Sequence, residues 1–346
     1  MAMLLAAGVV CLAVRVEAQI RIGAILSITG PTAAQGVGYK NAFALMPATM
    51  GGQSVTYVVR DDGGDPTAAV TIAQKLIAED HIDALIGPAT NPSMLSVMPV
   101  ANAAHVPMIG LTPLGFDVQK YTFTFDDAQP AVLMVQGVVD HMKAHGVKTV
   151  GFIGYSDGWG DQVLAALKQD AGAAGIRVVD EERYARTDSS VQPQVLRAMS
   201  HHPDAMMLGG SAVPGALPQI ALVQRGYKGQ VYNNHGVVSP AYISVGGAAV
   251  AGCIAPTGPL VVYDQLPDTS PVKPVATAFM TQYLAKFGPQ SRNAFAGYSW
   301  DAMLLIQAAV PEALRAGSRG RRRSGMGCGR GSSACMGWWG RMASMT

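Results

Sequence analysis

The sequence predicts an α/β protein made of two lobes, each a doubly wound parallel sheet. Short apolar, β-branched runs alternate with helix-forming stretches along most of the chain, which is typical of a parallel sheet covered on both faces. The alternation forms two series of roughly 100 residues each. The length of 346 residues is enough for about two domains, in agreement with two such series.

The first series opens with a short apolar run that ends at the turn Gly30-Pro31. Its second helix has a clear start, since Asp65 suits the N-cap position and Pro66 suits the first turn. The elements predicted for this series, in chain order, are strand Ile20–Ser27, helix 33–50, strand Ser54–Arg60, helix Thr67–Asp80, strand Ile82–Ile86, helix Met94–Ala104 and strand Val106–Leu111.

The alternation resumes after Thr124 and predicts the second lobe. Its elements are helix 130–145, strand Thr149–Gly154, helix 160–174, strand 176–179, helix 190–200, strand Ala205–Leu208, helix 214–225 and strand Gln230–Asn233. These strands are short and apolar, as expected of strands buried on both faces.

The composition excludes several classes of protein. A chain that is 49% hydrophobic and 14% charged is not intrinsically disordered, and its 40 glycines and 21 prolines exclude a long coiled coil.

The formal net charge of +2 does not represent any functional surface of the protein, because the charges are unevenly distributed along the chain. Residues 316–346 hold six arginines and no acid, whereas the rest of the chain has 19 basic and 23 acidic residues.

The first 18 residues resemble a secretory signal. The apolar stretch Met3–Val14 is too short to span a bilayer, and it is followed by Val16-Glu17-Ala18. We therefore expect cleavage near Ala18–Gln19 and export to the periplasm. Cys253 is the one cysteine between this signal and residue 316, so we expect no disulfide and no zinc site there.

Candidate ligand contacts follow the predicted strands, because doubly wound sheets bind ligands at the carboxyl ends of their strands. These loops are rich in glycine, small hydroxyl residues and helix starts, which together suit a carboxylate. They are Ser27–Pro31, Gly87–Ser93, Thr112–Pro113, Tyr155–Gly160, Gly209–Ser211 and Asn233–Gly236.

Four stretches carry a resemblance to a known family: IRIGAILSITGP at 20–31, DDGGDPTAAV at 61–70, IGPAT at 86–90 and VYDQLP at 262–267. In this order they resemble the periplasmic leucine/isoleucine/valine-binding proteins, from about Ile20 to Leu314. The resemblance implies a type I periplasmic binding protein fold, with two lobes joined by a hinge. It also implies a non-enzymatic, monomeric receptor that has no cofactor, binds a small carboxylate and delivers it to an inner-membrane ABC permease.

The resemblance also implies which residues contact the ligand. Asn91 and Thr112 match positions that hold the ligand carboxylate, and Trp159 matches an aromatic residue that packs on the ligand. His235 stands where the family has an acid that pairs with the ligand ammonium, and Ser211 stands in place of another aromatic residue. With Ser27, these are the six candidate ligand contacts. A neutral histidine suits an ammonium poorly, so an aromatic acid or another carboxylate without an ammonium is the alternative to a branched-chain amino acid.

The family chain crosses between its lobes three times. Here the crossings are expected near Thr124, near Ala255–Thr257 and after residue 315, which gives lobe 1 as 19–124 plus 255–315 and lobe 2 as 125–254. The resemblance stops at the basic, Gly/Arg-rich segment 316–346, for which we expect disorder. The last part of lobe 2 is therefore expected to be absent, through truncation or a slipped reading frame, and a non-functional homologue is a further alternative.

Other functions find less support in the sequence. Gly36-Val37-Gly38 lacks the third glycine of a dinucleotide fingerprint, and neither a P-loop nor a nucleophile elbow is present, which argues against a hydrolase. His141 and His145 share a helix face without the glutamate of an HExxH motif, and the spacing of Asp61, Asp62 and Asp65 does not make an EF-hand. We expect no metal at these positions and no nucleic acid partner. A sensor domain of the same two-lobe fold remains an alternative to transport.

Overall fold

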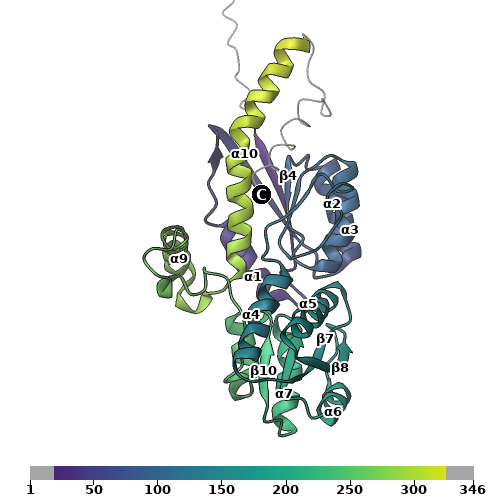
Figure 1. The fold of residues 1–346 in the computed structure, drawn as a ribbon. Coiled ribbons are helices and arrows are strands. Elements are labelled where there is room, and N and C mark those ends of the chain that lie inside the picture. Colours follow the sequence, from purple (N-terminus) through teal and green to yellow (C-terminus); the bar gives the residue numbers. More distant parts are fainter. Residues whose placement is uncertain (1–18, 325–346) are drawn as a thin grey trace, which may run out of the picture.

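The computed structural model describes residues 19–324, with side-chain surroundings for residues 19–315. In Figure 1 the chain forms two lobes, one holding α1–α3 and α10 and the other holding α4–α7. The predicted signal at 1–18 and its cleavage point at Ala18 lie outside the described residues, as does the part of the basic tail from 325 onward. Among the described residues no helix is both long and apolar enough to cross a bilayer.

Lobe 1 contains a six-stranded sheet in the order β2-β3-β1-β4-β5-β6, parallel except for the β2–β3 pair. Its strands are β1 (Ile20–Leu26), β2 (Thr49–Met50), β3 (Gln53–Asp61), β4 (Ala84–Ile86), β5 (Met108–Gly110) and β6 (Thr124–Asp126). Side chains of α1 (Ala33–Phe43) and α10 (Phe295–Ser324) share a core with one face of this sheet. Those of α2 (Pro66–Ala78) and α3 (Asn91–Ala103) share a core with the other face.

Lobe 2 contains a parallel four-stranded sheet in the order β10-β9-β7-β8. Its strands are β7 (Thr149–Tyr155), β8 (Arg177–Tyr184), β9 (Ala205–Gly209) and β10 (Gln230–Asn233), and its helices are α4 (Ala131–Ala144), α5 (Gly158–Ala174), α6 (Gln192–Ser200), α7 (Ala216–Gln224) and α8 (Pro240–Gly246). The helices α4–α7 share one apolar core with this sheet. The predicted doubly wound α/β architecture with two parallel sheets is therefore confirmed.

Two segments connect the lobes within the described range. The first follows β6, which pairs with β5, so lobe 1 extends past the boundary predicted at Thr124 and the crossing lies at 127–130. The second follows Ile254, which forms a bridge with Tyr232 of β10. It leads to α9 (Lys273–Phe287), which packs on α1 of lobe 1.

Several predicted boundaries differ from the structure. The helix predicted over 33–50 ends at Phe43, because Pro47 follows soon after. The strand predicted over 176–179 continues to Tyr184, and α10 continues to Ser324, inside the segment where disorder was expected. Short 3₁₀ turns lie at Val213–Gly215, His235–Val237, Gly247–Val250, Tyr263–Gln265 and Pro289–Ser291.

The predicted start of α2 is confirmed in detail. The Asp65 carboxylate accepts hydrogen bonds from the backbone N–H groups of Thr67 and Ala68, at 2.7 and 3.2 Å. This is the geometry of an N-cap, and Pro66 occupies the first helical position.

Candidate ligand-binding site between the lobes

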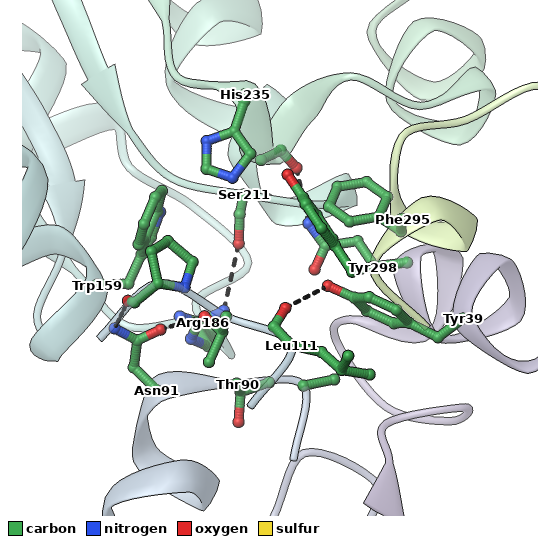
Figure 2. A pocket seen from close by; sticks show the side chains of 15 residues that line it. Tyr39, Thr90, Asn91, Leu111, Trp159, Arg186, Ser211, His235, Phe295 and Tyr298 are labelled. Carbon is green, nitrogen blue, oxygen red and sulfur yellow. Dashed lines mark hydrogen bonds between the residues drawn. The ribbon is translucent and has the colours of Figure 1, made fainter. Parts of the chain in front are cut away.

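A small cavity of about 30 Å³ lies between the two lobes. Figure 2 shows that lobe 1, lobe 2 and the start of α10 each contribute side chains to its wall. The residues that line it are Gln35, Tyr39, Ala89, Thr90, Asn91, Leu111, Thr112, Pro113, Trp159, Arg186, Ser211, His235, Gly236, Phe295 and Tyr298. A cavity of this size holds about one water molecule, so a larger solute requires the lobes to separate before it enters.

The lobe 1 wall is formed where two strands end. Thr90 caps α3 and Asn91 begins it, so the positive end of the helix dipole lies at the cavity. The Asn91 side chain donates to the carbonyl of Pro113 at 3.0 Å and accepts a short hydrogen bond from the Thr112 hydroxyl. These bonds fix Asn91 and Thr112 as one rigid polar unit beside the helix start.

The lobe 2 wall contains one cation, Arg186, in the loop that follows β8. Its Nε donates to Asp157 Oδ2 at 2.6 Å, its Nη1 donates to Ser211 Oγ at 3.3 Å, and its guanidinium lies over the ring of Tyr155 at 4.3 Å. The side chain is 18% exposed, so the charge is largely shielded from water. Because a guanidinium has five N–H donors, donors remain beyond these two bonds for a planar anion.

Trp159 and His235 face each other edge to face at the same wall, with ring centroids 5.4 Å apart. Trp159 Nε1 and His235 Nδ1 are both buried and have no hydrogen-bond partner among the described residues. Burial lowers the pKa of His235 to about 4, so its ring is neutral near pH 7. A buried polar atom without a partner costs about 1–3 kcal/mol, so both atoms favour a ligand that supplies one.

Aromatic rings from α1 and α10 complete the cavity. The rings of Tyr39 and Phe295 meet edge to face at 5.6 Å, and Tyr298 lies beside Phe295 at 6.3 Å. The Tyr39 hydroxyl donates to the carbonyl of Leu111 at 3.0 Å, which holds this ring against the end of β5. These flat apolar surfaces suit the faces of a planar or apolar solute.

Five of the six candidate contacts lie in this cavity: Asn91, Thr112, Trp159, Ser211 and His235. Ser27 does not line it, because its hydroxyl donates to Asp62 Oδ1 at 2.7 Å within lobe 1. Sequence reasoning missed Arg186, Gln35 and the aromatic residues of α1 and α10. A strand predicted to its true end at Tyr184 would have placed Arg186 in a strand-end loop.

Among residues 19–315 no group of three or more His, Cys, Asp or Glu side chains is placed to hold an ion. The rings of His141 and His145 stack at 3.9 Å, and Asp61 accepts backbone N–H groups of its own turn and of Ile28. Cys253 is a free thiol.

Comparison with known proteins places this geometry in a family. The family model described as "Periplasmic binding protein" matches residues 19–324. The chain belongs to the periplasmic binding protein family. A periplasmic binding protein captures solutes for an ABC-type system and performs no chemistry on them, so the predicted non-enzymatic class and family are confirmed.

Individual relatives agree with this assignment. The fold superimposes with a TM-score of 0.88 on an extracellular ligand-binding receptor from Rhodopseudomonas palustris HaA2, which is 35% identical, over 95% of this chain and 89% of that one. The Leu/Ile/Val-binding protein BraC3 of Rhizobium johnstonii is 25% identical over 69% of this chain and 67% of its own. The Leu/Ile/Val-binding protein homolog 3 of Brucella melitensis is 26% identical over 68% and 67%.

Proposed function

We propose that this periplasmic binding protein captures an aromatic carboxylate without an ammonium group and presents it to an inner-membrane ABC permease. The observation that carries the proposal is the charge of the inter-lobe cavity. Its one charged lining residue is Arg186, and none of its described lining residues is an acid. A carboxylate finds a helix start there and the N–H donors of Arg186 that its pair with Asp157 leaves over, whereas an ammonium finds no acid among the described lining residues.

The proposed binding mode uses both lobes. The ligand carboxylate lies between Arg186 and Ser211 on one side and the start of α3 with Thr112 on the other. The ring packs among Tyr39, Trp159 and the aromatic residues of α10, while the unpartnered Nε1–H of Trp159 offers one further donor. Because the contacts come from both lobes, the ligand favours by differential binding a form in which the lobes close on it, with the lobes spaced further apart than here, where the cavity holds about one water molecule.

A branched-chain amino acid is the second candidate. The similarity to the two Leu/Ile/Val-binding proteins favours it, and the apolar rings of the cavity would accept an aliphatic side chain. The neutral His235 and the absence of an acid among the described lining residues weigh against it.

Isothermal titration of the purified protein with benzoate, leucine and valine tests the proposal. We expect saturable binding of benzoate and none of leucine or valine. The variant Arg186→Gln should weaken benzoate binding at least tenfold, whereas Arg197→Gln, whose exposed guanidinium pairs with Glu182 outside the cavity, should not. Tight binding of leucine with no binding of benzoate would assign the protein to the second candidate.

A further inference from the structure

A second cavity, of about 120 Å³, lies at the hinge. Both connecting segments line it, the first through Gln129 and the second through Gly258 and Leu260. Helices α9 and α10 close its sides. It is therefore built from the two segments that connect the lobes. Tyr298 is the one residue that lines both this hinge cavity and the cavity between the lobes, within the described part of the chain.

The walls of the hinge cavity are mostly apolar and aromatic. Phe279 and Trp300 lie with ring centroids 5.0 Å apart, and the Tyr298 hydroxyl donates to Gln129 Oε1 at 3.2 Å. The side chains of Val272 and Val275 are exposed at its rim, which leaves a path to solvent. Since an apolar cavity of about 150 Å³ in another protein holds benzene, this one suits a compact ligand slightly smaller than that.

The ionisable groups near the hinge cavity are acidic, and the one that lines it, Asp301, is exposed to solvent. Asp301 lines the cavity, and no ion pair within residues 19–315 involves Asp126, Asp127 or Asp301. Both carboxylate oxygens of Asp127 are buried. Burial raises the pKa of Asp127, and the nearby Asp301 and Asp126 raise it further, so the three carboxyls form one cluster.

The basic residues of the neighbouring segments are already engaged. Lys273 at the start of α9 contacts the Leu266 carbonyl and Asp268. Arg292, before α10, pairs with Asp264 and donates to the carbonyl of Val261. Neither lines the cavity, so neither supplies a positive charge within it.

We propose that the hinge cavity binds a small organic ammonium ion with a compact apolar body. Asp301 is its counter-ion, and the faces of Phe279, Trp300 and Tyr298 attract the cation and cover its methyl groups. The proposal does not rest on the ligand proposed for the cavity between the lobes, since it uses a different cavity and the opposite charge.

Titration calorimetry at pH 8 with tert-butylammonium and with its neutral isostere tert-butanol tests this site. Burial raises the pKa of Asp301 to about 6, so its carboxylate is ionised at pH 8. We expect one saturable site for the ammonium and at least tenfold weaker binding of the alcohol. Asp301→Asn keeps the shape of the cavity and should weaken ammonium binding at least tenfold. The matched control Asp268→Asn, an almost fully exposed acid outside the cavity, should leave it unchanged.

A cavity-filling variant, Ala276→Leu, should abolish ammonium binding, and its thermal unfolding curve shows whether it folds. If Ala276→Leu fails to fold, Asp301→Asn alone decides the question. Equal binding of the alcohol and the ammonium, or full binding by Asp301→Asn, overturns the proposal. So does a wild-type protein that binds benzoate but no ammonium, a result that leaves the proposed transport function standing.

Discussion

The side-chain amide of Gln35 donates a hydrogen bond of 2.7 Å to the carbonyl oxygen of Gly236, and this bond joins the two lobes. Gln35 belongs to α1 of lobe 1, whereas Gly236 lies in the turn that follows β10 of lobe 2. Both residues line the cavity between the lobes. Because the bond spans the two lobes, separation of the lobes breaks it.

Replacing Gln35 should therefore weaken ligand binding by destabilising the closed form. A neutral buried hydrogen bond contributes about 1 kcal/mol. Gln35→Met should therefore raise the dissociation constant of the ligand bound in the cavity between the lobes about fivefold. Titration calorimetry measures the loss, and small-angle scattering of the ligand-bound variant should report a larger fraction of open molecules. Gln53→Met, in β3 away from the cavity, is the control. An unchanged affinity for Gln35→Met would show that the bond does not hold the lobes together.

His235 should make the stability of the protein depend on pH. Burial lowers its pKa to about 4, below the ordinary value of about 6.5, so the unfolded chain binds the proton more tightly. This contribution to the free energy of unfolding rises as the pH increases from about 4 to 6.5 and is constant above that range. Its full size is about 3 kcal/mol.

The His235 contribution is isolated by comparing variants. Burial raises the pKa of Asp126 to about 7, which acts in the opposite direction over much of the same range. The measured quantity is therefore the difference between wild type and His235→Gln in urea unfolding at pH 4.5, 5.5, 6.5 and 7.5. We expect this difference to shift in favour of wild type as the pH rises, with His235→Met giving the same result. A difference independent of pH would contradict the buried, neutral ring.

Asp157 has two roles that a pair of substitutions separates. One carboxylate oxygen caps α5 by accepting from Trp159 N and Gly160 N, while the other pairs with Arg186. Asp157→Asn keeps a cap and loses the charged pair, whereas Asp157→Ala loses both. We expect Asp157→Ala to be less stable than Asp157→Asn by about 1 kcal/mol in urea unfolding. Equal stabilities would mean that the cap contributes nothing.

Gly36 should tolerate no side chain, although it lies in a helix. A Cβ there would stand 1.9 Å from the backbone oxygen of Ser27, at the end of β1. Gly36→Ala should therefore destabilise the protein by about 2 kcal/mol or more, despite the better helix propensity of alanine. Gly137→Ala in α4, where a Cβ would meet no atom within 4 Å beyond the adjacent residues and the backbone of its own helix, is the matched control and should be neutral or stabilising by up to about 1 kcal/mol. A neutral Gly36→Ala would show that α1 moves away from β1 without cost.

The sequence predicts most of the fold because buried parallel strands are short, apolar and flanked by turns. It fails where a strand lies at an edge. β8 pairs on one side only, with β7, so it carries the half-buried Asp180 and the exposed Glu181, and the apolar run that predicts a strand stops before them. β6 has three residues and ends in an aspartate, too little pattern to detect.

The same reasoning explains which site residues could be found. Three of the site residues could be found because a well-predicted strand precedes them. Thr112 and Ser211 lie in the loops after such strands, and Asn91 begins the helix after one. Arg186 follows a strand whose end was placed too early. Tyr39 and Tyr298 reach the cavity from helices that are distant in sequence, and only the packing of α10 against α1 brings them together.

Tyr298 lines both cavities. If the two ligands prefer different positions of its ring, binding at one site changes the affinity of the other. Thermodynamic reciprocity then requires the amine to change the affinity for the carboxylate by the same factor by which the carboxylate changes the affinity for the amine. The Tyr298 ring would then determine the concentration of amine at which uptake of the acid is halved, if the two ligands oppose each other, or doubled, if they favour each other.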